Sequence, residues 1–135
     1  MKKLLSILAI ALLMCTNIKA QDTTTLALNC DLYLEGQSSE LNIFHIAITD
    51  DESNEVTFDA KQSFSCELNM NHTYTVIIKS DDHTARFLNI DTYGNITQKM
   101  TYHYKASLIK WRTNKDIIVW DIIKYDSLSN KFCKK

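Results

Sequence analysis

Residues 55–92 decide the fold of this chain, and they read EVTFDAKQSFSCELNMNHTYTVIIKSDDHTARFLNIDT. Apolar residues occupy alternate positions in two segments, 64–68 and 74–78, which a short polar corner separates. A third segment, 85–92, follows a second polar break. Alternation with a period of two is typical of half-buried β-strands. The stretch therefore predicts three antiparallel strands that pair in sequence order, which is a β-meander.

The rest of the chain continues the same pattern. Proline is absent, and β-branched and aromatic residues fill the periodic segments. Beyond the first 20 residues, no segment combines helical periodicity with capping residues. Short strands at this spacing predict an all-β domain, a single β-sandwich of about seven to eight antiparallel strands. The further strands are expected at residues 26–34, 41–49, 56–58, 97–111 and 117–123, with a last short one that ends at Phe132.

The first 20 residues have the features of a cleaved secretory signal peptide. A basic start precedes an apolar run, and Ala20 stands before a polar segment. The run is shorter than the ~20 apolar residues that a membrane-spanning helix needs, so cleavage after Ala20 is favoured over a retained anchor. The other alternative is a lipoprotein acylated at Cys15, although Met14 stands where a small residue is usual. We expect residues 1–20 to be removed and residues 21–135 to form one exported domain, periplasmic or extracellular.

The charge balance excludes one class of partner. The chain has 15 basic and 16 acidic residues, and three of the lysines lie in the predicted leader. The mature domain is therefore net acidic, which argues against nucleic acid as its main partner. We expect no transmembrane span in the mature chain.

Three of the four cysteines follow the leader, so at least one thiol has no intramolecular partner. Cys30 shares an alternating face with leucines, and Cys66 shares one with Phe64 and Leu68. Both are therefore expected to point into the core. A disulfide between Cys30 and Cys66 is conceivable in an exported protein, and two buried thiols that act as small apolar groups are the alternative.

Several of these residues resemble a known family. The pattern Phe64 to Leu68, Tyr74 to Ile78 and then residues 86–92 is similar to the transthyretin-like (prealbumin-like) sandwich of carboxypeptidase regulatory-type domains, above all its small exported versions in the envelope of Gram-negative bacteria. The resemblance implies the sandwich fold. One enzymatic branch of that fold hydrolyses 5-hydroxyisourate and ends in Tyr-Arg-Gly-Ser. This chain ends differently, at residues 132–135, so the resemblance does not imply that activity.

The inventory of chemical groups predicts no catalytic residue, no metal ligand set and no cofactor. The four histidines are scattered, and no two have the close spacing of a zinc site. Two glycines in the whole chain leave no phosphate-binding loop, and no serine lies in a nucleophile elbow.

One segment, residues 97–115, is basic and aromatic without a single acidic residue. Basic groups beside aromatic rings can hold anionic or sugar ligands by charge and stacking. The alternative is a solvated strand whose tyrosines pack inward, as alternation assigns them. The candidate ligand-binding residues are Lys99, Tyr102, Tyr104, Lys105, Lys110 and Arg112.

Taken together, these features predict an exported, non-enzymatic β-sandwich that acts in binding or assembly at the bacterial cell envelope. The partner is expected to be another envelope protein or a second copy of the chain, bound through a sheet edge or through the apolar strand around Val119 and Trp120. The rival hypothesis is a small ligand-binding or hydrolytic domain that uses the basic segment from Lys99 to Lys115 together with His103.

Overall fold

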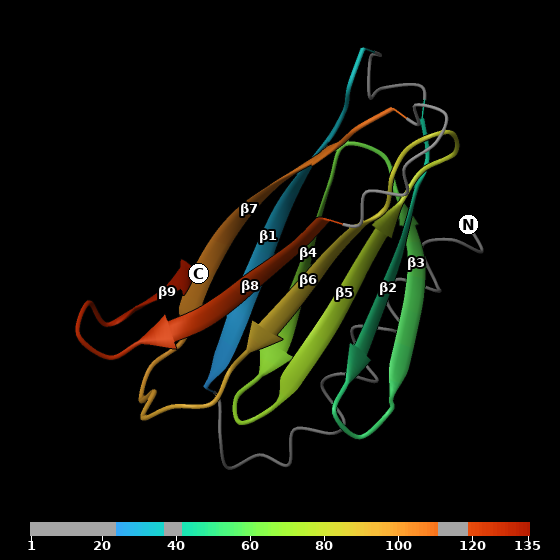
Figure 1. Ribbon diagram of the computed structural model, residues 1–135. Helices are drawn as coiled ribbons and strands as arrows, with labels where there is room; N and C mark the ends of the chain where they lie inside the picture. Colours follow the sequence, from blue (N-terminus) through green and yellow to red (C-terminus); the bar gives the residue numbers. More distant parts are fainter. Residues whose placement is uncertain (1–23, 37–41, 111–118) are drawn as a thin grey trace.

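A computed structural model describes residues 24–36, 42–110 and 119–135 of the chain. The predicted leader, Cys15 and Arg112 therefore lie outside the described residues. All regular elements of the described part are β-strands, which form two sheets of a sandwich (Figure 1). They are β1 (Thr25–Leu34), β2 (Phe44–Asp50), β3 (Glu55–Ala60), β4 (Ser63–Asn69), β5 (Thr73–Lys79), β6 (Arg86–Asp91), β7 (Met100–Leu108), β8 (Val119–Asp126) and β9 (Lys131–Lys134).

The two sheets differ in size. The smaller has the strand order β4-β1-β7, and the larger has the order β3-β2-β5-β6-β8-β9. Nine strands are described, slightly more than the seven to eight expected. Most neighbours are antiparallel as predicted, but β1 pairs with β7, and β6 with β8, in parallel. Alternation in sequence indicates which side chains are buried and carries no information on strand direction.

The predicted meander is wrong in one strand. β5 and β6 are antiparallel neighbours, but β4 pairs with β1 in the smaller sheet. The polar corner after β4 therefore carries the chain from one sheet to the other. A hairpin and such a corner are equally compatible with two amphipathic strands, because both arrangements bury the same alternate side chains.

A fully buried threonine, Thr92, holds this corner. Its hydroxyl lies 2.7 Å from the carbonyl oxygen of Asn69 and 2.9 Å from that of His72, and it accepts a 3.0 Å hydrogen bond from the His72 N–H. The hydroxyl of Tyr74 accepts another, 2.9 Å long, from the Asn69 N–H. Asn71 has a φ of 64°, a left-handed conformation that asparagine tolerates better than most residues. Side chains therefore satisfy the backbone groups that the change of sheet leaves without strand partners.

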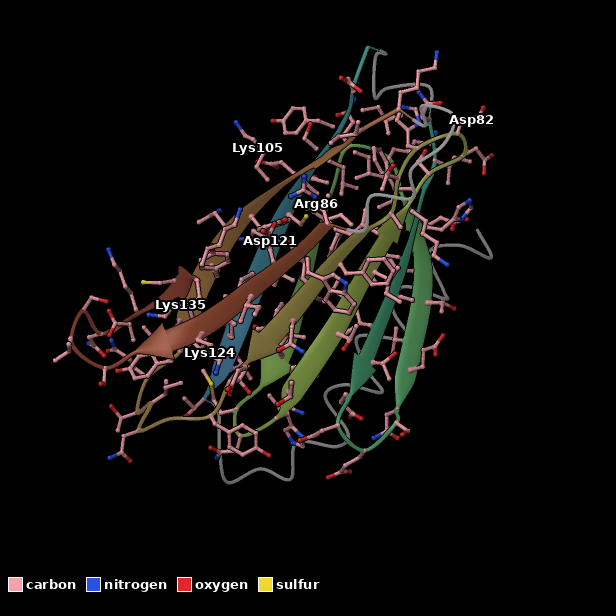
Figure 2. All side chains as sticks on the ribbon, in the orientation of Figure 1. Asp82, Arg86, Lys105, Asp121, Lys124 and Lys135 are labelled. Atoms are coloured by element: carbon pink, nitrogen blue, oxygen red, sulfur yellow. The ribbon has the colours of Figure 1, made fainter. Side chains whose placement is uncertain are left out.

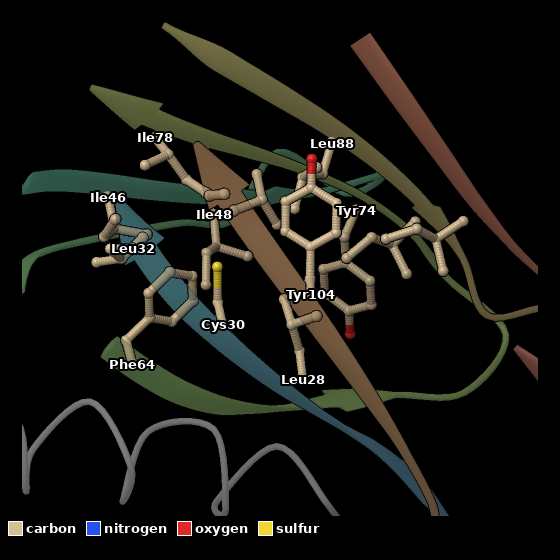
Figure 3. Close-up of a cluster of buried hydrophobic side chains, with 14 of the residues drawn as sticks. Leu28, Cys30, Leu32, Ile46, Ile48, Phe64, Tyr74, Ile78, Leu88 and Tyr104 are labelled. Atoms are coloured by element: carbon tan, nitrogen blue, oxygen red, sulfur yellow. The ribbon is translucent and has the colours of Figure 1, made fainter. Parts of the chain in front are cut away.

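The core lies between the sheets and is continuous (Figure 3). β1 contributes alternate residues from Leu26 to Leu34, each no more than 6% exposed. These face the inward side chains of the larger sheet, among them Ile46, Ile78 and Leu88. β1 lies in the middle of the smaller sheet, and from Leu26 onward its buried and less buried residues alternate without a break.

Candidate binding surface

Strand β8 presents apolar side chains on both of its faces. Ile123 is fully buried, whereas Trp120 and Ile122 on the other face are 53% and 42% exposed. Adjacent exposed apolar side chains that form a contiguous patch can mark a contact surface. The predicted apolar strand around Val119 and Trp120 therefore exists, and its outward face is open to solvent in the described part of the chain.

The edge of β8 is only half covered. β9 pairs with the second half of the strand, from Ile123 to Asp126, and the Lys135 N–H adds a 2.8 Å hydrogen bond to the carbonyl of Ile122. Backbone groups of a strand repeat their direction every second residue. The N–H and C=O of Trp120 therefore point toward the same edge as the Ile122 carbonyl, and no described residue bonds to them there.

The ring of Trp120 stacks on that of Phe87 from the neighbouring strand β6. The ring centroids lie 4.7 Å apart and the planes are inclined by 27°. Strand pairing continues this contact across the sheet, because Phe87 lies opposite Ile77 and Ile77 lies opposite Ala47. An apolar row consisting of Ala47, Ile77, Phe87 and Trp120 thus crosses the outer face of the larger sheet.

A buried ionic network fixes β8 against its neighbours. Asp121 accepts hydrogen bonds from Arg86 of β6 (2.9 Å), Lys134 of β9 (3.0 Å) and the hydroxyl of Tyr104 of β7. Figure 2 shows Arg86 and Asp121 next to each other. Arg86 also donates to the backbone carbonyl of Ser107 at 2.9 Å, so this one network joins both sheets.

The network determines the charge states of its members. Burial alone would raise the pKa of the Asp121 carboxyl, but the hydrogen bonds from Tyr104, Lys134 and Arg86 outweigh burial and hold that pKa below its ordinary value. Burial, and then the hydrogen bond to Asp121, raise the pKa of Tyr104. Asp121 is therefore an anion at neutral pH and Tyr104 a neutral donor. The sequence showed Asp121 as the one charge in an apolar strand, but nothing in the sequence identified its partners.

The tyrosines of the predicted basic and aromatic surface lie on the inward face of their strand. Tyr104 is buried, with its hydroxyl in the Asp121 network, and Tyr102 is partly buried. Burial raises the pKa of Tyr102. Lys105 points outward, with its ammonium group 5.4 Å from the ring centre of Tyr33, and Figure 2 shows it directed away from the network.

The remaining described lysines of that surface lie at opposite ends of β7. Lys99 forms an ion pair with Glu67 of β4. Lys110 follows β7, pairs as an isolated bridge with His83, and donates its backbone N–H to Glu35 at 3.0 Å. The structure therefore does not bring the described members of the set together into one cluster.

The cysteines of the described part are free thiols, so the bridge considered between Cys30 and Cys66 is not formed. The register explains this result, since Cys30 lies opposite Phe64 and Cys66 lies opposite Leu28. The two thiols are diagonal neighbours on adjacent strands, not a facing pair. Burial raises the pKa of each to about 12.

Two of the histidines form pairs with carboxylates on the surface. His45 lies 2.7 Å from Asp59 on the adjacent strand β3, and His72 lies 2.8 Å from Asp51. In the part of the chain that the structure describes, no group of three or more His, Cys, Asp or Glu side chains is arranged to hold a metal ion.

No protein-family model matches the sequence, and no curated protein matches it significantly. Across residues 24–36, 42–110 and 119–135, no helix is long and apolar enough to cross a membrane. The class that the structure defines is an all-β protein with two facing sheets.

Proposed function

We propose that this protein is an exported, non-enzymatic β-sandwich of the transthyretin-like, carboxypeptidase regulatory-like kind that acts in binding or assembly at the bacterial cell envelope. Its contact site is the open half of β8. The observation that carries the proposal is the coincidence, at Trp120, of a strand edge to which no described residue bonds with a side chain that is 53% exposed.

An uncovered edge offers backbone donors and acceptors to an added strand. A partner strand placed in line with β9 would bond to the N–H and C=O of Trp120 and extend the larger sheet. Tryptophan is also one of the residues that most often dominate the binding energy of protein interfaces. Backbone pairing would thus provide affinity, and the indole would provide a specific contact.

Two other described edge strands, β7 and β3, are better protected against strand addition. On β7, the Ser107 carbonyl accepts a hydrogen bond from Arg86, and Lys105 projects from the same strand. The edge strand β3 carries the exposed acidic residues Glu55 and Asp59. Charged side chains and occupied carbonyls are common means of discouraging edge pairing. This contrast favours β8 as the site of association.

Two replacements at one position separate the backbone contribution from that of the side chain. Trp120→Ala removes the indole and keeps the N–H, whereas Trp120→Pro removes both. Because this N–H points to the open edge, proline costs no hydrogen bond to β6. Thermal unfolding of both variants establishes that they fold.

The assays are size-exclusion chromatography with light scattering for self-association, and cross-linking mass spectrometry of the protein in envelope extract for a partner. We expect association to weaken in Trp120→Ala and to disappear in Trp120→Pro. A parent protein that is strictly monomeric and forms no cross-link at β8, or equal association in both variants, would contradict strand addition. Mass spectrometry of the secreted protein tests export, for which we expect an amino terminus at Gln21.

A further inference from the structure

We propose that the outer face of the larger sheet is a binding platform for neutral oligosaccharides. The platform is the eight-residue patch formed by two neighbouring rows across β2, β5, β6 and β8. Its apolar row is Ala47, Ile77, Phe87 and Trp120. Its polar row is Thr49, Thr75 and Asn89, and the apolar Ile122 continues that row on β8. This site is on the face of the sheet and goes beyond the strand addition proposed for the edge.

The apolar row has the shape of an extended ligand. Neighbouring strands lie about 4.8 Å apart, so a row across four strands is about 14 Å long and a single side chain wide. Phe87 covers one side of the Trp120 indole, and the 53% exposure of Trp120 leaves the indole accessible to a stacked ligand. The C–H face of a pyranose ring packs on an aromatic surface of this kind.

The polar row provides hydrogen-bonding groups that are not otherwise used. Thr75 and Asn89 lie directly opposite each other on β5 and β6, and both are partly buried. Within the described part of the chain, neither side chain has a hydrogen-bond partner. An amide supplies both donors and acceptors and a hydroxyl supplies one donor and two lone pairs. Such groups match sugar hydroxyls, which also donate and accept.

The charges around the platform favour a neutral ligand over an ionic one. No residue of the platform is charged. On one side, His45 pairs with Asp59 at 2.7 Å, and Lys79 lies beside His45. On the other side, Asp91 lies 3.7 Å from Lys124. Glu55, opposite Thr49, and Lys79 are not ion-paired with a described residue, whereas His45 with Asp59 and Asp91 with Lys124 are balanced on the protein itself. The two single charges have opposite signs and lie at different positions on the border, so neither an acidic nor a basic chain would find a cluster of free partners.

The size of the platform argues against a second copy of the chain as its occupant. A stable protein interface buries about 800 Å² on each partner and involves about 20–30 residues a side. The platform has eight residues in two rows. Its area fits a short glycan, whose affinity depends on stacking and a few directed hydrogen bonds.

The test uses tryptophan emission. The chain contains two tryptophans, so the variant Trp111→Phe leaves Trp120 as the only reporter. In this background, soluble cellohexaose, chitohexaose and laminarihexaose are titrated separately into the full mature protein. We expect at least one of the three to give a saturable change of emission at micromolar to millimolar concentration. Affinity electrophoresis in gels that contain the corresponding polysaccharide provides a second readout without fluorescence.

Three variants locate the site. In the emission titration, Asn89→Ala should weaken binding several-fold. Trp120→Ala removes the reporter itself, so this variant is measured by affinity electrophoresis, in which it should weaken binding about tenfold or more, which corresponds to about 1.4 kcal/mol. The matched control is Tyr33→Ala, an exposed aromatic residue on the opposite sheet, which should bind as the parent does. Thermal unfolding verifies that each variant is folded.

The proposal is overturned if no probe gives a saturable response, if Asn89→Ala and Trp120→Ala bind as tightly as the parent, or if the emission follows protein concentration instead of sugar concentration. The last result would identify a second copy as the occupant. Failure here is distinguishable from failure of strand addition. Glycan binding should be lost equally in Trp120→Ala and Trp120→Pro, whereas partner binding should differ between them, and Asn89→Ala should affect the glycan alone.

Discussion

Replacement of Thr92 by valine should destabilise the protein far more than the loss of one surface hydroxyl would. Threonine and valine have almost the same shape, so the change removes hydrogen bonds and leaves packing nearly intact. In the folded protein, the Thr92 hydroxyl donates to the carbonyl oxygens of Asn69 and His72 and accepts a hydrogen bond from the N–H of His72. The Thr92 side chain is fully buried, so water cannot take over these bonds without a rearrangement of the corner.

The magnitude follows from the groups left without partners. A buried donor or acceptor that loses its partner costs ~1–3 kcal/mol. The backbone bonds from Thr92 N to His72 O and from Asn71 N to Thr92 O persist in the variant, so the corner is weakened and not abolished. We therefore expect the free energy of unfolding to fall by about 2–3 kcal/mol, with a decrease in Tm of about 6–12 °C for a domain of this size.

The assay is urea unfolding followed by circular dichroism, with calorimetry for Tm. Thr57→Val is the matched control, because Thr57 is exposed on the edge strand β3, and its replacement should change the free energy of unfolding by no more than about 0.5 kcal/mol. If Thr92→Val were as stable as Thr57→Val, the hydroxyl would not hold the corner. The account of how the chain passes from β4 to β5 would then be refuted.

Three further outcomes are expected. Asp121→Asn should lower the free energy of unfolding at neutral pH by about 3 kcal/mol, because it leaves Arg86 without its buried counterion. The pKa of the Asp121 carboxyl is depressed in the folded protein. The stabilisation that Asp121 provides is therefore complete above the unfolded pKa of about 4 and is lost as the pH falls through the folded pKa. Urea unfolding should accordingly show a smaller difference in the free energy of unfolding between parent and variant at pH 3 than at pH 7. The thiols of Cys30 and Cys66, whose pKa burial raises to about 12, should resist iodoacetamide at pH 8 until the protein is unfolded, as counted by mass spectrometry. Gly94→Ala should lower Tm, because Gly94 has a φ of 151° and an added Cβ would lie 2.9 Å from a ring carbon of Tyr125.

Each of these three predictions can be compared with a control in the same protein. Gly36 has a φ of 73° and open space around the position of a Cβ, so Gly36→Ala should show backbone strain alone and cost less than the change at Gly94. Cys133 lies on the short strand β9 outside the hydrophobic core, whereas Cys30 belongs to that core and Cys66 packs against it, so Cys133 should react first. If Asp121→Asn kept the full pH dependence of the parent, the acid sensitivity would have to come from other carboxylates.

The buried faces of the strands were predictable from the sequence. Leu26 to Leu34 and Tyr74 to Ile78 alternate in the structure as they do in the sequence, because a strand with one buried face must place apolar residues at every second position. The inward orientation of Tyr104 also follows from alternation. Of the two hypotheses for the basic segment, alternation predicted the solvated strand with inward tyrosines, not the ligand surface.

Strand partners were not predictable in the same way. Phe64 and Leu68 alternate equally well in a meander and in a sheet shared with β1, and the choice depends on the hydrogen bonds of Thr92, a residue distant in sequence from Asn69. The same limit applies to the candidate site. The apolar strand around Trp120 was visible in the sequence, but the half-covered edge depends on where β9 ends, and Phe87 stacks on Trp120 only through a parallel pairing.

The parallel pairing of β1 with β7 has a consequence for the order in which the chain can fold during its synthesis. β1 is the first described strand to be made and the middle strand of its sheet, yet Leu26 gains its second strand neighbour only after Met100 has been made. Contacts between residues so far apart in sequence slow folding, because a long loop must close before they can form. A nascent chain that ends before β7 cannot complete the smaller sheet, so the native sandwich cannot form until β7 has been translated. That delay suits a protein that must be threaded through a membrane before it folds, as the proposed export requires.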